Sequence, residues 1–231
     1  MIRHGQASFG KADYDRLSLL GIDQARILGE HLVGTGIVPD AIYSGTMTRQ
    51  MQTAQVVIDA YVAEGAALPE VSVVPGLNEF DSDAIVSSVL PDMMDDDPLL
   101  ADDLEKMYRQ KDSFKRIFEG AMLRWISEVG GRPGIETWEG FVARVKGVIE
   151  NIRSENGRNK TVFAFTSGGP VAGALKHVLA IPDETAIRLN WQIVNSSYTS
   201  FMYNSQRITL SGFNSTAHLM LHGRGSLITY R

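Results

Sequence analysis

The chain has 231 residues, of which 44% are hydrophobic and 21% are charged, proportions that fit a globular protein and exclude a disordered or fibrous one. It has no cysteines, which excludes a disulfide scaffold, a zinc–thiolate site and a cysteine nucleophile. Its 22 Lys and Arg residues against 27 Asp and Glu give a net charge of −5, which argues against a nucleic-acid partner.

Helix and strand patterns alternate in the first third of the chain. Apolar residues in 17–33 recur at spacings near three and four, which predicts an amphipathic helix. Residues 39–43 are predicted as a short buried strand, 46–61 as a second helix and 71–74 as a second strand. This alternation predicts a parallel sheet that helices cover on both faces.

The middle of the chain, about 81–133, interrupts this alternation. Its patterns predict helices over 99–110 and 113–129, preceded by an acidic, turn-rich segment that ends at Pro98. An insertion of this kind between strands is typical of a lid over a sheet edge. The alternative is a helical excursion with no part in a site.

The alternation returns in the last third. Residues 136–154 are predicted as a helix, 161–165 as a central strand without charge, and 170–179 as a further helix. Residues 197–203 and 208–213 are predicted to form a hairpin. We find no repeat and no long linker, so we predict one three-layer αβα domain over the whole chain, with a mostly parallel central sheet and a helical lid.

The sequence opens with Arg3, His4 and Gly5 at the end of a short predicted strand. Open α/β folds bind ligands at the carboxyl edge of the sheet, where this triplet would lie. Gly5 allows a sharp turn or a close backbone approach to a ligand. Arg3 offers a planar fork that suits a phosphate or a carboxylate. Alone, three residues are a weak signal.

Further motifs follow this triplet in a fixed order. In chain order they are LSLLG leading to QA at 17–25, SGTMTRQMQTA at 44–54, LNEFD at 77–81, TSGG at 166–169, NSS at 195–197 and NSTAHL at 214–219. Together they resemble the histidine phosphatase superfamily, also called phosphoglycerate-mutase-like. Members of that family show RHG, LTxxGxxQA, SSPLxRAxQTA, an LxE acid loop and S/T-H-G-G, so the resemblance covers nearly the whole chain.

The resemblance implies phosphoryl transfer through a phosphohistidine, with no metal and no cofactor. His4 would attack phosphorus as a neutral imidazole, with one ring nitrogen free and the other held by a hydrogen bond. Arg3 and Arg49 would hold the phosphoryl oxygens. The alternative for Arg49 is a solvated charge on a helix.

Glu79 would act as the general acid and then as the base that activates water. A carboxylate beside a phosphate has its pKa raised by the like charge, which suits this task. Asp81 and Asp83 in the same loop are rivals for the role. The alternative for Glu79 is a loop carboxylate that faces solvent.

Ser167 departs from the family pattern, which has a second histidine that donates a charged hydrogen bond to the phosphoryl group. Charged hydrogen bonds contribute about 1.5–3 kcal/mol against about 1 kcal/mol for neutral ones. The serine would therefore slow the reaction roughly five- to thirty-fold. Ser167 could instead cap the helix that follows. In both cases Gly168 and Gly169 would direct backbone N–H groups at an anion.

The other histidines are expected outside the site. His177 should point away from it, His218 is expected to be structural, His222 is a weaker candidate, and His31 is expected on a helix surface. A rival mechanism with Ser167 as nucleophile lacks support, because Phe165 stands where the G-x-S-x-G motif needs glycine.

The predicted function is hydrolysis of a small phosphomonoester through a phosphohistidine on His4. The alternative is a catalytically impaired member that binds a phosphorylated ligand or a protein partner. A phosphoglycerate mutase is less favoured, because mutases keep the second histidine and have an Asn where Gly10 stands. The six aspartates of 92–103 should also repel bisphosphates.

Location, assembly and chain start complete the expectations. No apolar run approaches the roughly 18 residues of a membrane span, and the N-terminus lacks the layout of a signal peptide. We therefore expect a cytoplasmic protein that binds no membrane, and its assembly is compatible with a homodimer. Family members have about three more strand residues before RHG, so we expect the natural chain to begin upstream of Met1.

Overall fold

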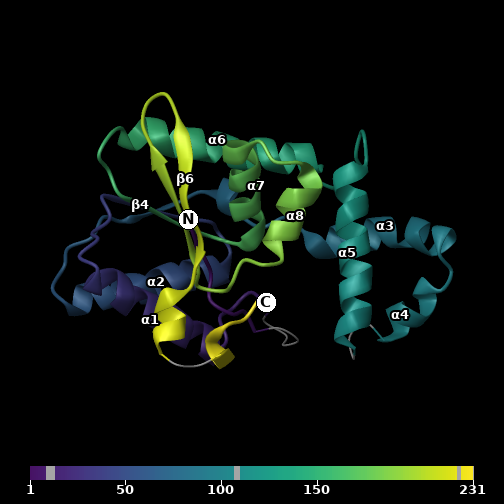
Figure 1. Ribbon diagram of the computed structural model, residues 1–231, viewed down its shortest axis with the longest axis horizontal. Coiled ribbons are helices and arrows are strands. Elements are labelled where there is room, and N and C mark those ends of the chain that lie inside the picture. Colours follow the sequence, from purple (N-terminus) through teal and green to yellow (C-terminus); the bar gives the residue numbers. More distant parts are fainter. Residues whose placement is uncertain (9–13, 107–109, 223–224, 231) are drawn as a thin grey trace.

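A computed structural model describes residues 1–8, 14–106, 110–222 and 225–230. It contains a six-stranded sheet with the order β3–β2–β4–β1–β5–β6 (Figure 1). The strands are β1 (Ile2–Arg3), β2 (Ala41–Ser44), β3 (Val71–Val73), β4 (Val162–Thr166), β5 (Tyr198–Tyr203) and β6 (Ile208–Ser215). Strands β3, β2, β4 and β1 pair in parallel, and β5 pairs antiparallel with both β1 and β6. The mostly parallel sheet and the hairpin are confirmed.

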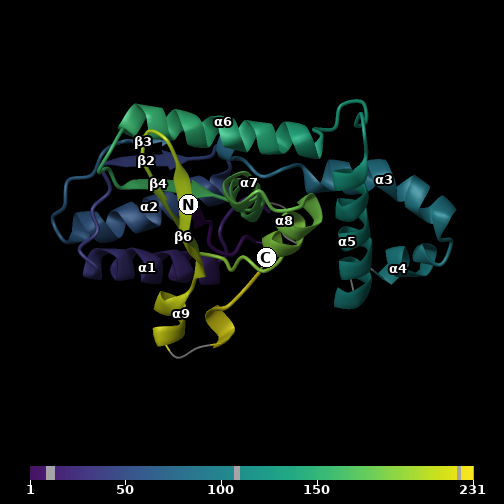
Figure 2. The same ribbon diagram turned by 45° about the horizontal axis from the view of Figure 1, so that its top comes forward.

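Helices cover both faces of this sheet (Figure 2). On one face lie α1 (Leu19–Gly34) and α2 (Thr48–Ala63), and on the other lie α6 (Trp138–Asn156) and α7 (Gly168–Leu179). Helix α8 (Asp183–Asn190) packs against α7, and the short α9 (Ala217–Leu221) packs against α1. The helices and strands expected before 81 and over 136–179 are confirmed, with ends that differ by a few residues, whereas α8 and α9 were not expected.

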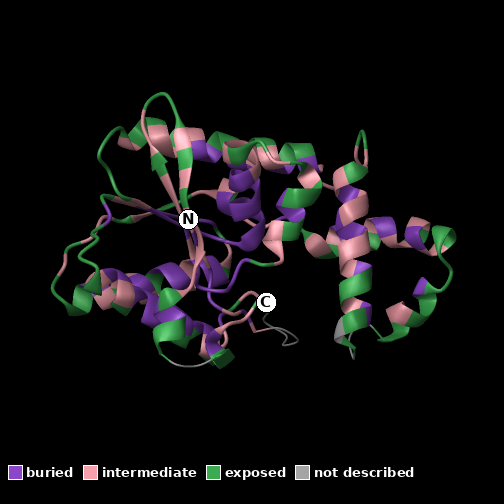
Figure 3. Ribbon diagram, viewed as in Figure 1, coloured by how far each residue is buried: buried purple, intermediate pink, exposed green. Residues whose placement is uncertain are grey.

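Apolar side chains hold these layers together. On the α1/α2 face, Leu28 and Val57 pack against Phe163 and Phe165 of β4. Figure 3 shows buried residues concentrated in the centre of the sheet and in α7, whereas the β5–β6 hairpin is mostly intermediate or exposed. Ser18 caps the beginning of helix α1, since its hydroxyl accepts a hydrogen bond from the backbone N–H of Gly21 at 3.0 Å.

Helices α3 (Ser82–Asp96), α4 (Leu100–Lys106) and α5 (Lys111–Ser127) form an arm beside the sheet (Figures 1 and 2). The prediction of turns before Pro98 is wrong, because α3 fills that segment. Asp81 caps this helix, and Ile85, Val89 and Met93 are buried at helical spacing. The dense aspartates and Pro91 obscure this periodicity in the sequence. The helix predicted over 99–110 ends at Lys106, and 107–109 lie outside the described residues.

The acidic stretch of the arm is partly neutralised. Three of its six aspartates pair with arginines of the arm and the loop after it: Asp92–Arg132 at 2.5 Å, Asp96–Arg124 at 2.6 Å and Asp103–Arg116 at 2.8 Å. These pairs reduce the negative potential that the sequence alone indicates. The expected repulsion of bisphosphates stays a prediction, which now depends mainly on Asp95, Asp97 and Asp102.

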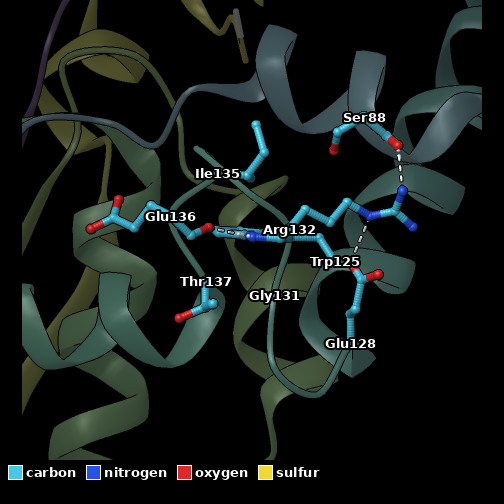
Figure 4. A pocket seen from close by; sticks show the side chains of 8 residues that line it. All are labelled: Ser88, Trp125, Glu128, Gly131, Arg132, Ile135, Glu136 and Thr137. Atoms are coloured by element: carbon cyan, nitrogen blue, oxygen red, sulfur yellow. Dashed lines mark hydrogen bonds and ion pairs between the residues drawn. The ribbon is translucent and has the colours of Figure 1, made fainter.

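A pocket lies where the arm meets the loop before α6 (Figure 4). There Arg132 donates to Glu128 at 2.9 Å and to the carbonyl of Ser88 at 2.5 Å. The indole N–H of Trp125 donates to the carbonyl of Glu136 at 2.8 Å. These polar groups satisfy one another, so the pocket is a structural junction.

Within the described residues, none of the helices combines the length and apolarity needed to cross a membrane.

Candidate active site

The site lies at the carboxyl edge of the sheet, where β1, β4 and β2 end next to one another. Arg3 is paired with Thr166 in the parallel register of β1 and β4, and the N–H of His4 donates to the carbonyl of Thr166 at 2.9 Å. His4 and Ser167 therefore leave the sheet as lateral neighbours. The chain leaves β2 through Gly45, whose N–H donates to the carbonyl of Phe165 at 3.1 Å.

His4 is buried and both of its ring nitrogens are engaged. Nδ1 lies 2.6 Å from the carbonyl of Gly5, which can only accept, so Nδ1 carries the proton. Nε2 therefore has a free lone pair, and Nε of Arg49 donates to it at 3.1 Å. Burial, followed by the charges of Arg49 and Arg3, holds the pKa of His4 well below its usual value. The imidazole is thus neutral and has one nitrogen available as a nucleophile.

Arg49 is fixed from its far side by Asp15. Its Nη1 lies 2.6 Å from Oδ1 of Asp15, and the other carboxylate oxygen accepts from the N–H of Thr48 at 2.7 Å. The ring of Tyr14 lies 5.7 Å from the guanidinium carbon, within the range of a cation–π contact. Sequence reasoning missed Asp15, because one aspartate ahead of a helix carries no pattern that marks it.

Arg3 is anchored by two backbone carbonyls from the last forty residues of the sequence. Its Nη1 donates to the carbonyl of Ile193, and its Nη2 donates to that of Tyr230 at 2.8 Å. Its Nε is buried and has no partner among the described residues. Burial lowers the pKa of Arg3 to about 10, which leaves the side chain cationic at neutral pH. A fixed cation whose Nε–H is unused is suited to an anion.

Glu79 is held beside the first turn of α7. Its Oε2 accepts from the N–H of Gly169 at 3.0 Å, and its Oε1 accepts from the N–H of Phe80 at 3.2 Å. Burial raises the pKa of Glu79 despite these hydrogen bonds and the nearby charges of Arg49 and Arg3. In the free protein the cause of the raised pKa is burial, whereas the expected effect of a phosphate's like charge stays a prediction.

The rival carboxylates of this loop lie elsewhere. Asp81 caps α3 by accepting from the N–H of Ala84 at 2.9 Å. Asp83 is exposed in the first turn of the same helix. Neither shares the buried environment that raises the pKa of Glu79.

The glycines of the site allow close contacts. A Cβ on Gly169 would lie 1.9 Å from Oε1 of Glu79, and one on Gly5 would lie 2.3 Å from the carbonyl oxygen of Gly21. The N–H of Gly169 donates to Glu79, and that of Gly5 donates to Thr53 at 3.0 Å. In this state both N–H groups are therefore occupied by the protein itself.

Gly168 meets the end of α8. A Cβ at this position would lie 2.3 Å from Oδ1 of Asn190, so α8 delivers a side-chain amide to the beginning of α7. This close approach requires glycine. Among the described residues, no group of three or more His, Cys, Asp or Glu side chains could hold a metal ion.

Ser167 is buried at the N-cap position of α7, but its hydroxyl makes no capping hydrogen bond. It accepts instead from Nε2 of Gln50 at 2.8 Å. Ser167 therefore occupies the N-cap position of α7, as one interpretation predicted, but its side chain does not cap the helix. The carbonyl of the neighbouring His4 accepts from Nδ2 of Asn195 at 3.2 Å and from the N–H of Ser196 at 3.1 Å.

The remaining histidines lie outside this cluster. His177 contacts Glu150 at 3.2 Å. His218 is buried and its Nε2 lies 3.0 Å from the carbonyl of Ser196, which agrees with a structural role. His31 is half-buried and its ring stacks on that of His218 with 5.4 Å between centroids, so the expectation of a surface residue is wrong.

A protein-family model matches most of the chain. The model described as "Histidine phosphatase superfamily (branch 1)" matches residues 1–106 and 93–216. The chain belongs to the histidine phosphatase superfamily. Within that superfamily, a 2,3-bisphosphoglycerate-dependent phosphoglycerate mutase of Leifsonia xyli subsp. xyli is 26% identical over 212 residues, which cover 82% of this chain and 80% of the relative.

Solved structures of similar fold include enzymes of two kinds. The phosphoglycerate mutase from Bacillus anthracis matches with a TM-score of 0.64 and 17% identity, covering 96% of this chain and 95% of that one. A phosphoserine phosphatase from Entamoeba histolytica matches with a TM-score of 0.62 and 19% identity, covering 94% and 96%. At these identities the likeness shows that this member of the histidine phosphatase superfamily shares their fold.

Proposed function

We propose that the chain hydrolyses phosphomonoesters through a phosphohistidine on Nε2 of His4. One observation carries the proposal: Nδ1 of His4 is tied to the carbonyl of Gly5 while Nε2 keeps its lone pair beside Arg49. Burial prevents this imidazole from being protonated at neutral pH, so it remains a nucleophile.

In the first step, Nε2 of His4 forms a bond to phosphorus as the bond to the leaving oxygen breaks. Arg49 turns its Nε–H from Nε2 to a phosphoryl oxygen, and Nε of Arg3 supplies a second charged donor. Glu79 gives its proton to the leaving alkoxide, for which its raised pKa prepares it.

In the second step, the Glu79 carboxylate takes a proton from water as the water oxygen attacks phosphorus. The N–P bond breaks, inorganic phosphate leaves and the neutral imidazole is regenerated. No metal or cofactor enters the proposal, because the two arginines supply the positive charge that the transferred group requires.

Ser167 supplies an uncharged donor in the place of the second family histidine, so we expect slow turnover. This feature also favours a second candidate, a member that binds a phosphorylated ligand or a protein partner without turning it over. Mutase activity is less favoured for the same reason. Gly10, which stands where mutases have an Asn, lies outside the described residues.

The proposed partner is a small phosphorylated molecule, and neither nucleic acid nor membrane is part of the proposal. A cytoplasmic location and a homodimer stay predictions.

The function is tested by turnover of p-nitrophenyl phosphate, with 2,3-bisphosphoglycerate and 3-phosphoglycerate as further substrates. We expect hydrolysis by the parent protein and none by His4→Ala, while His177→Ala serves as the matched control and keeps the parent rate. Turnover that survives His4→Ala would refute the phosphohistidine route. Binding of inorganic phosphate without turnover would favour the second candidate, and phosphate exchange between phosphoglycerates would favour a mutase.

A further inference from the structure

Gln50 lies fully buried beside the proposed nucleophile, and the role described above leaves it unused. Its Nε2 donates to the carbonyl of Leu77 at 3.1 Å and to the hydroxyl of Ser167 at 2.8 Å. Its Oε1 lies 3.4 Å from the N–H of Met47. A carbonyl only accepts and an N–H only donates, so both ends of the amide are assigned by their neighbours.

This orientation fixes the direction of the Ser167 hydroxyl. An amide nitrogen has two hydrogens and no lone pair for accepting, and both hydrogens of the Gln50 amide are used. The oxygen of Ser167 therefore accepts from Gln50, and its own proton must point elsewhere. Among the described residues, the Ser167 hydroxyl donates to no hydrogen-bond acceptor, although the residue is completely buried.

The register of β1 and β4 brings Ser167 beside the residue of the proposed nucleophile. Arg3 and Thr166 are partners in the parallel register, so His4 and Ser167 follow them as neighbours on adjacent strand ends. Adjacent strands lie about 4.8 Å apart, and laterally paired side chains share one face of a sheet. A phosphoryl group on Nε2 of His4 would be the acceptor that the Ser167 proton lacks.

Three departures from the family motifs meet at this point. Gly45, Gln50 and Ser167 stand where the motifs quoted above have serine, alanine and histidine. A Cβ on Gly45 would lie 1.9 Å from Oε1 of Gln50, so the glycine makes room for the glutamine. Gln50 and Ser167 together have as many non-hydrogen side-chain atoms as the alanine and histidine of the family motifs. The side-chain volume that the family has at the histidine position is therefore found here at position 50.

We propose that Gln50 is a positioning residue, which directs the hydroxyl proton of Ser167 at the phosphoryl group and fills the space of the missing histidine. The inference rests on the proposed function of His4. Gly45, Gln50 and Ser167 together provide a hydrogen-bond donor for the phosphoryl group where the family has a histidine. Gln50 acts on that group only through Ser167.

A double-mutant cycle tests this coupling. The variants are Gln50→Met, which keeps nearly the same shape without the amide, Ser167→Ala, and their combination, each with its melting temperature measured. Loss of one neutral hydrogen bond should lower kcat for p-nitrophenyl phosphate about five-fold in each single variant. In the combination we expect no further loss beyond Ser167→Ala. Losses that multiply would show that Gln50 acts by packing alone and would overturn the proposal.

A second pair of variants gives a readout that packing cannot imitate. Ser167→His alone should be impaired, because Gln50 occupies the space, whereas Gln50→Ala with Ser167→His should exceed it and approach or exceed the parent rate. With p-nitrophenyl phosphate, whose leaving group needs no proton from Glu79, only this combination should gain an alkaline limb that the parent protein lacks, as the new imidazolium loses its proton. Equal rates for Ser167→His with and without Gln50→Ala would overturn the proposal.

The proposed function and this inference can fail separately. If the parent protein turns over no p-nitrophenyl phosphate, the proposed function fails, and the same cycle is then measured as the Kd of inorganic phosphate. Coupled losses of phosphate affinity in Gln50→Met and Ser167→Ala would still support the positioning role. Independent losses, or none, would overturn it.

Discussion

Nε of Arg49 donates a hydrogen bond to Nε2 of His4 at 3.1 Å, so the proposed phosphate clamp covers the proposed nucleophile in the free protein. The same guanidinium is held 2.6 Å from Asp15 on its other side. An entering phosphoryl group must replace His4 as the acceptor of the Nε–H, while the contact with Asp15 can persist. The histidine is thereby kept neutral and aligned until a phosphate arrives.

Asp15→Asn should loosen this clamp. The amide keeps the shape but removes the charge that fixes Arg49, and a charged hydrogen bond is roughly twice as strong as a neutral one. We expect KM for p-nitrophenyl phosphate to rise about three- to ten-fold with a smaller change in kcat. Asp23→Asn, an exposed aspartate of α1, is the matched control. An unchanged KM in Asp15→Asn would show that Asp15 does not fix the clamp.

Glu79→Gln should separate substrates by their leaving groups. A p-nitrophenolate departs without a proton, whereas an alkoxide requires one, so the loss of the acid should cost an alkyl phosphate at least ten-fold more than the aryl phosphate. The measurement compares kcat for p-nitrophenyl phosphate with that for β-glycerophosphate. Equal losses on both substrates, or a comparable loss in the exposed control Glu70→Gln, would argue against Glu79 as the acid.

The pH profile of the same carboxyl has a defined sign. Because burial raises the pKa of Glu79, its protonated form persists above the usual range of a carboxyl. The rate on the alkyl phosphate should fall as pH rises through this raised pKa, and Glu79→Gln should lack that limb. His4 should contribute no acidic limb near its usual pKa, because its pKa is far lower. A fall in rate on acidification near pH 6.5 that comes from protonation of His4 would contradict the buried neutral imidazole.

Gly169→Ala should displace Glu79. Its Cβ would lie 1.9 Å from Oε1 of that residue, so the carboxylate must move out of its position beside α7. Displacements of this size at a reacting group lower rates about ten- to a hundred-fold. Gly173→Ala in the same helix is the control, because its nearest contacts would be at 3.4–3.5 Å. Similar kcat values for the two variants would contradict the tight packing of Glu79 on Gly169.

His218 should make the fold sensitive to acid. Burial, then the neighbouring charge of His31, lowers the pKa of His218 to about 4, against the opposing hydrogen bond to Ser196 and with a smaller contribution from His222. Between pH 6.5 and 4 the unfolded chain binds a proton that the folded chain does not. The free energy of unfolding should therefore fall as pH decreases through this window, by about 2–3 kcal/mol at most.

Urea denaturation at pH 7 and pH 4.5 measures this dependence. His218→Gln should lose less stability on acidification than the parent protein, while His177→Gln should behave like the parent. His4, whose pKa is also lowered, is present in all three proteins, so its contribution cancels in the comparison. An identical acid sensitivity in His218→Gln would contradict the buried neutral state of His218.

The sequence predicts much of this architecture because its elements have clear periodicity. The apolar spacing in 17–33 and the uncharged strand at 161–165 place α1 and β4 to within a few residues, and their order determines a parallel sheet. Helix α3 was missed because Asp95, Asp96 and Asp97, with Pro91, suggest turns. Its buried stripe is visible only against the arm helices that cover it.

The site is partly predictable for a different reason. His4, Arg49 and Glu79 stand in motifs, so their proximity could be expected without coordinates. Asp15 and Gln50 could not be found this way, because their contacts join segments far apart in the sequence. The sequence does not show what an aspartate ahead of a helix contacts, nor where the two ends of a glutamine amide within a helix point.

The central claim is that a PO₃ group passes through Nε2 of His4, and trapping the intermediate tests it most directly. The protein is mixed with p-nitrophenyl phosphate, quenched in alkali and digested, and the peptides are mapped by mass spectrometry. We predict an acid-labile phosphate on the peptide that contains His4, absent from His4→Ala and enriched in Glu79→Gln, which cannot activate water. Sustained hydrolysis with the phosphate on another residue, or on none, would contradict the claim.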